Sequence, residues 1–275
     1  MLNKRLLGLL AVMALLLAVV IPAAAITYGE PDAGAHPYVG LVGFYDASGN
    51  WLWRCSGTLI APQVLLTAGH CTSPDGSDVP ARAQVWFDEQ VVLNPGVGYP
   101  DFGGVMGTPI ANPNYHGIYL PNTNDVGVIL LDTPVTNKGY GLLPTLSYLD
   151  KLATQRGLQD VTFTSVGYGL NEVKPRSVSL RTRFKALSHL VNLRSHLTDG
   201  YNLHTSNNGG NWAKGDASGG TCFGDSGGPV FYAQTNIVVG VTSFGMNNNC
   251  KGADFSYRTD SDAARGFLSQ FVAVP

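Results

Sequence analysis

The sequence is poor in charge, because Asp, Glu, Lys and Arg make up 13% of its 275 residues and no block of basic side chains occurs along it. Without such a block the chain lacks the electrostatic footprint that binds phosphate backbones, so nucleic acid is not expected as a partner. It also lacks CxxC and HxxxH spacings and any Asn-x-Ser/Thr acceptor. Neither a metal site nor N-glycosylation is therefore predicted.

Long hydrophobic runs are also scarce, since the only one extends over Leu6–Ile21. Lys4 and Arg5 precede this run and small residues, 23–25, follow it, which predicts a secretory signal peptide over 1–25 with cleavage at its end. The run is short for a membrane span, although an uncleaved anchor is the alternative. We expect residues 26–275 to be secreted, with no membrane attachment after signal removal.

Cysteine is rare, with four residues in the chain: Cys55, Cys71, Cys222 and Cys250. An even number in an exported protein predicts disulfides, and four cysteines allow three pairings. Cys55 and Cys71 bracket the segment that carries His70, so we expect this pair to be bonded. Closing a loop of that length stabilises a fold by about 3 kcal/mol.

Gly, Pro and Asn separate short apolar segments along the whole chain, which predicts a β-rich protein. The predicted strands are 38–44, 51–60, one or two within 81–93, 106–111 and 126–131, then 161–166, 178–187, 201–205, 229–232 and 237–244. Residues 132–157 are the expected connection between two halves, and most of 94–124 is an expected surface loop. One amphipathic helix is predicted over 261–272.

The stretch Gly220–Pro229 places Ser226 between glycines, on tightly turned backbone with amide groups beside it. A serine hydroxyl attacks a carbonyl only if a base removes its proton and donors meet the oxyanion that forms. A Gly-rich surface turn would look the same, so this stretch alone leaves both interpretations open.

Two further residues supply what a nucleophilic serine needs. His70 follows an apolar strand and a glycine directly, where a catalytic base would be held rigidly. Asp125 precedes the apolar run Val126–Leu131, so its carboxylate is expected to be half buried and to need a partner, for which His70 is suited. The alternatives are a His that caps a strand and an Asp that forms a turn.

With these residues in view the chain resembles the trypsin-like, or chymotrypsin-fold, serine proteases. The resemblance covers nearly all of 26–275 and rests on Ile26-x-x-Gly29-Glu30, Cys55–Ile60, Leu66–Cys71, Asn124–Leu131, Gly224–Pro229 and Ser243–Gly245. It implies an all-β fold of two six-stranded antiparallel barrels, at about 38–131 and 145–258, followed by the helix at 261–272. It also implies a monomeric, cofactor-free endopeptidase that acts on protein or peptide substrates.

The resemblance also implies roles for individual residues. Ser226 is the nucleophile, His70 its base and Asp125 the carboxylate that orients the base, with Ser243 hydrogen-bonded to Asp125. The amides of Gly224 and Ser226 form the oxyanion hole, and Cys222 pairs with Cys250. An Ile26 terminus freed by cleavage would pair with Asp225, although Ile-Thr-Tyr-Gly departs from the usual Ile-Val-Gly-Gly.

Substrate preference depends on the residues that correspond to the family's specificity pocket, namely Gly220, Thr221, Phe244, Gly245 and Asp254. Gly220 stands where trypsins carry an Asp, and Gly245 leaves the entrance open to large side chains. These two residues favour an apolar pocket slightly. Asp254 is the alternative, because a shift of one residue in the alignment would place its carboxylate inside and favour basic side chains.

Three other functions compete with the endopeptidase. A catalytically silent homologue would act as a binding module, but such proteins usually lose a triad residue, and this chain keeps all three. An esterase would use the same triad. The sequence Gly224-Asp-Ser226-Gly-Gly228 also fits the nucleophile elbow of α/β-hydrolases, which place their His after the Ser. Here the last His, His204, precedes Ser226, which excludes that fold.

Overall fold

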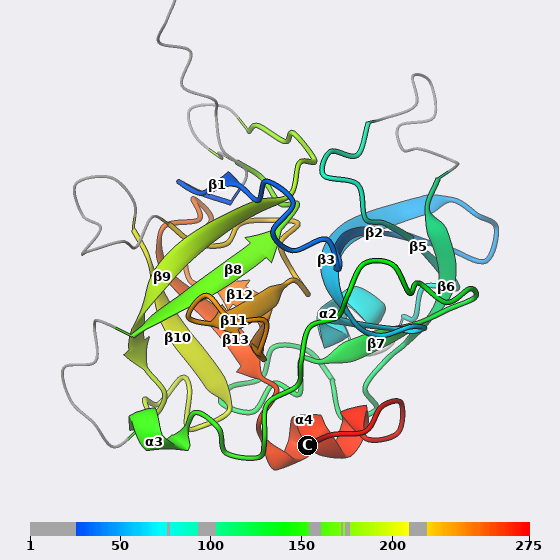
Figure 1. Ribbon diagram of the computed structural model, residues 1–275. Helices are drawn as coiled ribbons and strands as arrows, with labels where there is room; N and C mark the ends of the chain where they lie inside the picture. Colours follow the sequence, from blue (N-terminus) through cyan, green and yellow to red (C-terminus); the bar gives the residue numbers. More distant parts are fainter. Residues whose placement is uncertain are drawn as a thin grey trace, which may run out of the picture.

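The computed structural model describes residues 26–75, 78–92, 103–153, 161–171, 173, 177–208 and 219–275. The predicted signal peptide at 1–25 and most of the Gly-rich segment before Ser226 lie outside the described residues. Within the described residues the protein consists of two β-barrels side by side, with short helices between and below them (Figure 1). None of these helices has the length and hydropathy needed to span a bilayer.

The first barrel is a closed antiparallel sheet with the strand order β2-β3-β4-β7-β6-β5. Its strands are β2 (Val39–Tyr45), β3 (Trp51–Ala61), β4 (Val64–Thr67), β5 (Arg82–Trp86), β6 (Val105–Ile110) and β7 (Gly127–Leu131). Leu41, Leu59, Leu65 and Ile129 are fully buried inside it. The apolar run predicted at 126–131 is β7, and the predicted strand at 106–111 is β6.

The second barrel has the order β9-β10-β13-β12-β11-β8 and closes because β8 also pairs with β9. Its strands are β8 (Thr162–Gly167), β9 (Phe184–Asn192), β10 (Asn202–Asn207), β11 (Pro229–Tyr232), β12 (Val238–Gly245) and β13 (Gly252–Arg258), and β1 (Glu30–Pro31) adds to the edge of β9. Phe163, Leu203, Val230 and Val239 form part of its own apolar core. The predicted fold class, two six-stranded antiparallel barrels, is confirmed.

The predicted C-terminal helix is α4 (Asp262–Leu268), which is shorter than 261–272. Ser261 caps its N-terminus by accepting a hydrogen bond from the Ala264 amide. Ala264, Phe267 and Leu268 are buried on one face, and the helix lies below both barrels (Figure 1). The two other described helices, α2 (Gly69–Thr72) and α3 (Asp150–Ala153), are single turns.

Two strand predictions in the second barrel differ from the structure. The strand predicted at 178–187 is displaced: its last residues, 184–187, begin β9 (Phe184–Asn192), and the described backbone just before Phe184 forms no regular strand. Arg183 lies at that junction with its guanidinium buried against both barrels, a contact that no strand pattern encodes. Strand β13 was not predicted because Asp254, Ser256 and Arg258 interrupt its apolar pattern, although all three are buried.

The barrels meet along β3 of the first and the Ser226 loop of the second. The Ser56 amide on β3 donates to the Ser226 carbonyl over 2.8 Å, and the Ser243 hydroxyl on β12 donates to the carboxylate of Asp125. Residues far apart in the sequence are therefore held together at this junction.

Candidate active site

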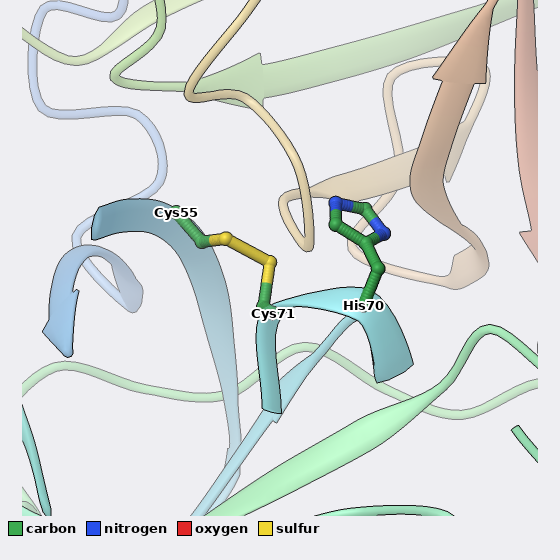
Figure 2. Close-up of side chains that lie close together, drawn as sticks. All are labelled: Cys55, His70 and Cys71. Carbon is green, nitrogen blue, oxygen red and sulfur yellow. A yellow bond between two sulfur atoms is a disulfide. The ribbon is translucent and has the colours of Figure 1, made fainter. Parts of the chain in front are cut away.

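His70 lies in the single turn of α2, directly after β4. The turn is fixed on both sides, because a disulfide joins Cys71 to Cys55 on β3 and the Trp53 indole donates to the Cys71 carbonyl over 3.0 Å. A side chain at Gly69 would press on the ring of Tyr115, with only 3.0 Å between a Cβ and the nearest ring atom. Figure 2 shows the imidazole of His70 beside the disulfide, with its ring clear of the sulfur atoms.

Asp125 is fully buried at the entrance to β7 and binds His70 twice. Its Oδ1 accepts the His70 amide over 2.7 Å, and its Oδ2 lies 2.9 Å from His70 Nδ1. The hydroxyl of Ser243 donates to the same Oδ2. These contacts fix the ring, and they leave Nε2 as the nitrogen that can take a proton from a nucleophile.

The electrostatics of this pair favour its ionised form. Burial opposes ionisation of Asp125, but the charge of His70 and the hydrogen bonds from His70 and Ser243 outweigh burial and lower the pKa of Asp125. Burial likewise disfavours a charged imidazole, yet the charge and hydrogen bond of Asp125 raise the pKa of His70 above its usual value. The pair is therefore suited to holding a proton transiently on His70.

Ser226 lies on a loop whose shape depends on two glycines with positive φ, Gly224 at 97° and Gly227 at 79°. A Cβ at Gly227 would overlap the Thr67 hydroxyl and would also lie 2.8 Å from the amide of Ala68, in the segment that leads into α2. The absence of a side chain at Gly227 thus lets the backbone of the Ser226 loop lie directly against the segment that carries His70. Among the described residues, the hydrogen bonds of His70 go to Asp125 and none joins it to Ser226. Such bonds are often long before substrate binds.

Asp225 is buried behind the serine loop. Its carboxylate accepts the amide of Gly169 over 2.8 Å and that of Cys222 over 2.9 Å, and burial raises its pKa to about 7. Ile26 is also fully buried, and the adjacent Thr27 accepts the Gly220 amide over 3.2 Å. The structure thus places the Ile26 segment beside the segment that leads to Cys222 and Asp225, through an isolated β-bridge between Thr27 and Gly220.

A pocket of about 250 Å³ opens beside Ser226. Of the predicted pocket residues, Thr221, Phe244, Gly245 and Asp254 line it. Phe244 stacks on Phe255, with ring centroids 4.7 Å apart, and a disulfide between Cys222 and Cys250 ties two walls together.

The carboxylate of Asp254 lies at this pocket and is held by two neighbours. It accepts the Thr221 amide over 2.5 Å and the Asn207 side-chain amide over 2.9 Å, while burial raises its pKa to about 6. A Cβ at Gly220 would overlap one of its oxygens, so Gly220 leaves the space that the carboxylate occupies. The pocket therefore combines an aromatic wall with an acidic group.

One group of potential metal ligands occurs in the described residues, formed by Cys55, His70 and Cys71. The two sulfur atoms are bonded to each other, so they are not free to ligate, and this group is not a metal site.

Sequence reasoning missed three polar residues around the site: Ser56, Tyr168 and Arg183. The hydroxyl of Ser56 contacts the Ser226 loop, and Arg183 donates to the Tyr168 hydroxyl over 3.0 Å. A serine on an apolar strand and an arginine before one carry no local signal, because their partners come from the other barrel.

Comparisons with known proteins agree with this geometry. Residues 28–264 match the family model described as Trypsin. Brachyurin of Leptuca pugilator is 30% identical over 207 residues, which cover 73% of this chain and 79% of brachyurin. Tryptase of Mus musculus is 28% identical over 225 residues, which cover 75% of this chain and 79% of tryptase. A solved structure of HL collagenase has the same fold, with a TM-score of 0.59 at 19% identity over 90% of this chain and 96% of its own.

Proposed function

The chain belongs to the trypsin family of serine proteases, and we propose that it is a secreted endopeptidase that cleaves peptide bonds through an acyl-enzyme. The observation that carries the proposal is the fully buried Asp125 bound to His70 Nδ1 at 2.9 Å, at the junction where the Ser226 loop packs against the histidine segment. Secretion is proposed from the signal-peptide pattern at 1–25.

The proposed reaction has two halves, acylation and deacylation, and the same triad acts in both. Ser226 Oγ bonds to the carbonyl carbon of the substrate while His70 Nε2 takes the hydroxyl proton. The C–N bond then breaks, and His70 returns the proton to the leaving amine. Water then attacks the acyl carbon while His70 Nε2 takes a proton from it; the bond between this carbon and Ser226 Oγ breaks, His70 returns the proton to Oγ, and the acid is released. Asp125 stabilises the imidazolium each time, in line with the raised pKa of His70.

The negative oxygen of the tetrahedral intermediate is proposed to bind the amides of Gly224 and Ser226. Each such donor is worth about 3 kcal/mol of transition-state stabilisation in enzymes of this mechanism. The positive φ of Gly224, 97°, supports the assignment, because it turns the backbone so that successive amides can converge.

We also propose that cleavage before Ile26 activates the enzyme. Asp225 is buried and its pKa is raised to about 7 because it lies far from water. An α-ammonium group at Ile26 would supply the positive charge that ionises this carboxylate, and the neighbouring backbone of Thr27 is already paired with Gly220. The ion pair would then hold the segment from Cys222 to Ser226 in its active shape.

For substrate preference we propose a mixed pocket that accepts large apolar residues and, once Asp254 is ionised, Lys or Arg. The aromatic wall at Phe244 and the open entrance at Gly245 favour large side chains, since a Cβ at Gly245 would approach no neighbour closer than 3.7 Å. Asp254 adds an acidic partner whose pKa of about 6 leaves it mostly charged at neutral pH.

The test is a profile of the products that residues 26–275 release from a mixed peptide library, compared with a Ser226→Ala control. Cleavage by the wild type alone, mainly after large apolar and basic residues, is the expected result. If folded wild-type protein with a free Ile26 terminus cleaves nothing, the endopeptidase proposal is wrong. Hydrolysis of simple esters in the same sample would then identify an esterase, and loss of both activities would identify a silent homologue.

A further inference from the structure

We propose that Ser56 is a positioning residue. Its side chain holds the loop from Cys222 to Ser226, which carries the proposed oxyanion hole, in its active shape. This inference rests on the proposed peptidase function, and it assigns a role to a residue outside the triad and outside the specificity pocket. Ser56 lies on β3 of the first barrel, whereas the loop it contacts belongs to the second.

Ser56 is fully buried and uses every polar atom it has. Its amide donates to the Ser226 carbonyl over 2.8 Å, and its carbonyl accepts the Thr67 hydroxyl over 2.9 Å. Its Oγ lies 2.9 Å from the Gly224 carbonyl and 3.0 Å from the Tyr168 amide. One residue therefore binds the loop on both sides of Asp225.

The direction of these hydrogen bonds follows from chemistry alone. A backbone amide can only donate, so the Tyr168 N–H points at Ser56 Oγ. A carbonyl oxygen can only accept, so the single hydroxyl proton of Ser56 points at the Gly224 carbonyl. Both capacities are thus used by fixed partners. The hydroxyl has no freedom to rotate without breaking a buried hydrogen bond, and a buried polar atom left without its partner is costly.

Tyr168, whose amide donates to the Ser56 hydroxyl, is itself held by hydrogen bonds. The hydroxyl of Tyr168 donates to the Asp88 carbonyl over 2.7 Å and accepts from Arg183 over 3.0 Å. The next residue, Gly169, donates its amide to Asp225 over 2.8 Å. Ser56 therefore links the loop to backbone that the rest of the fold already fixes.

The Gly224 carbonyl is the atom whose position matters for the proposed oxyanion hole. It belongs to the peptide unit between Gly224 and Asp225, which separates the two units that carry the donor amides of Gly224 and Ser226. Rotation of this central unit would turn the donors apart, and glycine offers little resistance to it. Asp225 restrains the loop through its side chain, and Ser56 restrains the central peptide directly.

The test compares Ser56→Ala with Thr58→Val. Thr58 lies on the same strand, is equally buried, and its hydroxyl has no hydrogen-bond partner in the described residues, so its variant removes a hydroxyl without touching the loop. For each enzyme, active sites are titrated with a fluorophosphonate, and kcat and KM are measured on one peptide substrate. A peptide aldehyde, which forms an oxyanion with Ser226, is compared with the matching peptide amide as inhibitor.

We expect Ser56→Ala to lower kcat about tenfold with little change in KM, a part of the 10²- to 10³-fold loss that follows removal of a whole donor. Binding of the aldehyde should weaken by the same factor, while binding of the amide should not change. Thr58→Val should keep the wild-type ratio of aldehyde to amide affinity, and Ser56→Thr, which keeps the hydroxyl, should restore most of it.

An unchanged ratio in Ser56→Ala, or an equal fall in Thr58→Val, would overturn the positioning role. If Ser56→Ala yields no titratable enzyme, Ser56→Cys takes its place with the same expectation, because a thiol keeps the volume and is only a weak hydrogen-bonding group. Failure of the proposed function is distinguishable and visible first, since the wild type would then not cleave the peptide substrate, and the inference, which rests on that function, would fail with it.

Discussion

Three buried aspartates near the site titrate differently because each faces different neighbours. Asp125 lies against His70, whose charge and hydrogen bonds outweigh burial and lower its pKa. Burial is the largest effect on Asp225 and Asp254 and outweighs their backbone and amide hydrogen bonds and, at Asp225, the charge of Arg54, so it raises their pKa values to about 7 and about 6. Identical side chains can therefore serve as a permanent anion, an activation partner and a pH-dependent specificity group.

At this scale, Asp125→Asn should lower kcat/KM about 10⁴-fold, the loss typical of this change in a Ser-His-Asp triad. The pH profile should move as well. In the wild type the pKa of His70 is raised, so activity disappears as the pH falls through a value above the usual pKa of His. Without the Asp125 charge that midpoint should shift to lower pH, which kcat/KM measured between about pH 5 and 9 would show. An unshifted midpoint would argue against His70 as the titrating base.

A second change, Asp254→Asn, should alter specificity and leave the chemistry intact. Two peptides are compared that differ only in having Arg or Phe before the cut. For the wild type, kcat/KM for the Arg peptide divided by kcat/KM for the Phe peptide should rise about tenfold or more as the pH increases through about 6, because Asp254 ionises there. The Asn variant should give a low and flat ratio. Titration of His70 cancels in the ratio, so a wild-type ratio independent of pH would show that Asp254 does not contact the substrate.

At the scale of elements, the site depends on short segments held by covalent and polar contacts. The single turn of α2 is too short to be stable alone, so its position comes from the disulfide to β3 and the indole of Trp53. The pocket walls are joined in the same way by the disulfide between Cys222 and Cys250. Each disulfide thus supports a different part of the proposed machinery.

Replacing Cys55 and Cys71 together by Ala should lower the free energy of unfolding by about 3 kcal/mol, because the bond closes a loop of 16 residues. It should also lower kcat, since α2 carries His70. The matched control replaces Cys222 and Cys250, which should mainly raise KM and change the residue preferred before the cut. Urea unfolding and steady-state kinetics on both double variants check this. A full kcat in the first variant would contradict the role given to α2.

The sequence predicted some elements well and others poorly, for physical reasons. Strand β7 and the positions of His70 and Asp125 at strand ends followed from uninterrupted apolar runs, whose burial depends on local pattern. Strand β13 was missed because Asp254 and Arg258 interrupt its apolar pattern, and their buried charges have partners in other segments, such as Asn207 and Asp150. The role of Ser56 was invisible for the same reason. Polar residues that are satisfied across the barrel junction leave no periodic signal.

At the scale of the whole molecule, Arg183 joins the two barrels. Its guanidinium is 2% exposed and donates to the Val39 and Phe87 carbonyls of the first barrel, each over 3.2 Å. It also pairs with Asp32 over 2.9 Å and with Glu89 over 2.6 Å. One buried cation therefore connects the N-terminal segment, the first barrel and the start of β9.

The ion pairs of Arg183 with Asp32 and Glu89 should make the free energy of unfolding depend on pH. The pKa of Asp32 is about 2, because hydrogen bonds from His36 and Arg183 outweigh the cost of burial. A carboxyl group whose pKa is lower in the folded than in the unfolded state stabilises the fold when it is ionised. For Asp32 this contribution is complete above the unfolded pKa of about 4 and is lost as the pH falls through the folded pKa of about 2. We expect Asp32→Asn to lower the free energy of unfolding by about 2 kcal/mol at neutral pH, and the difference from wild type to vanish near pH 2.

Denaturant unfolding across this pH range measures the effect, with Glu30→Gln as the control. Glu30 also pairs with a cation, Lys185, but its side chain is 70% exposed, so its loss should change stability by less than about 1 kcal/mol. An equal effect of the two variants would contradict the view that the buried cluster around Arg183 holds the barrels together.

The most direct test of the central claim is the reaction of residues 26–275 with an organofluorophosphonate, followed by intact mass and peptide mapping. If Ser226 is a nucleophile activated by His70, its oxygen displaces fluoride, and one adduct per chain should form on Ser226. In His70→Ala the rate should fall by at least about 10³-fold. Folded wild-type protein that forms no adduct, or forms it on another residue, would contradict the proposed mechanism.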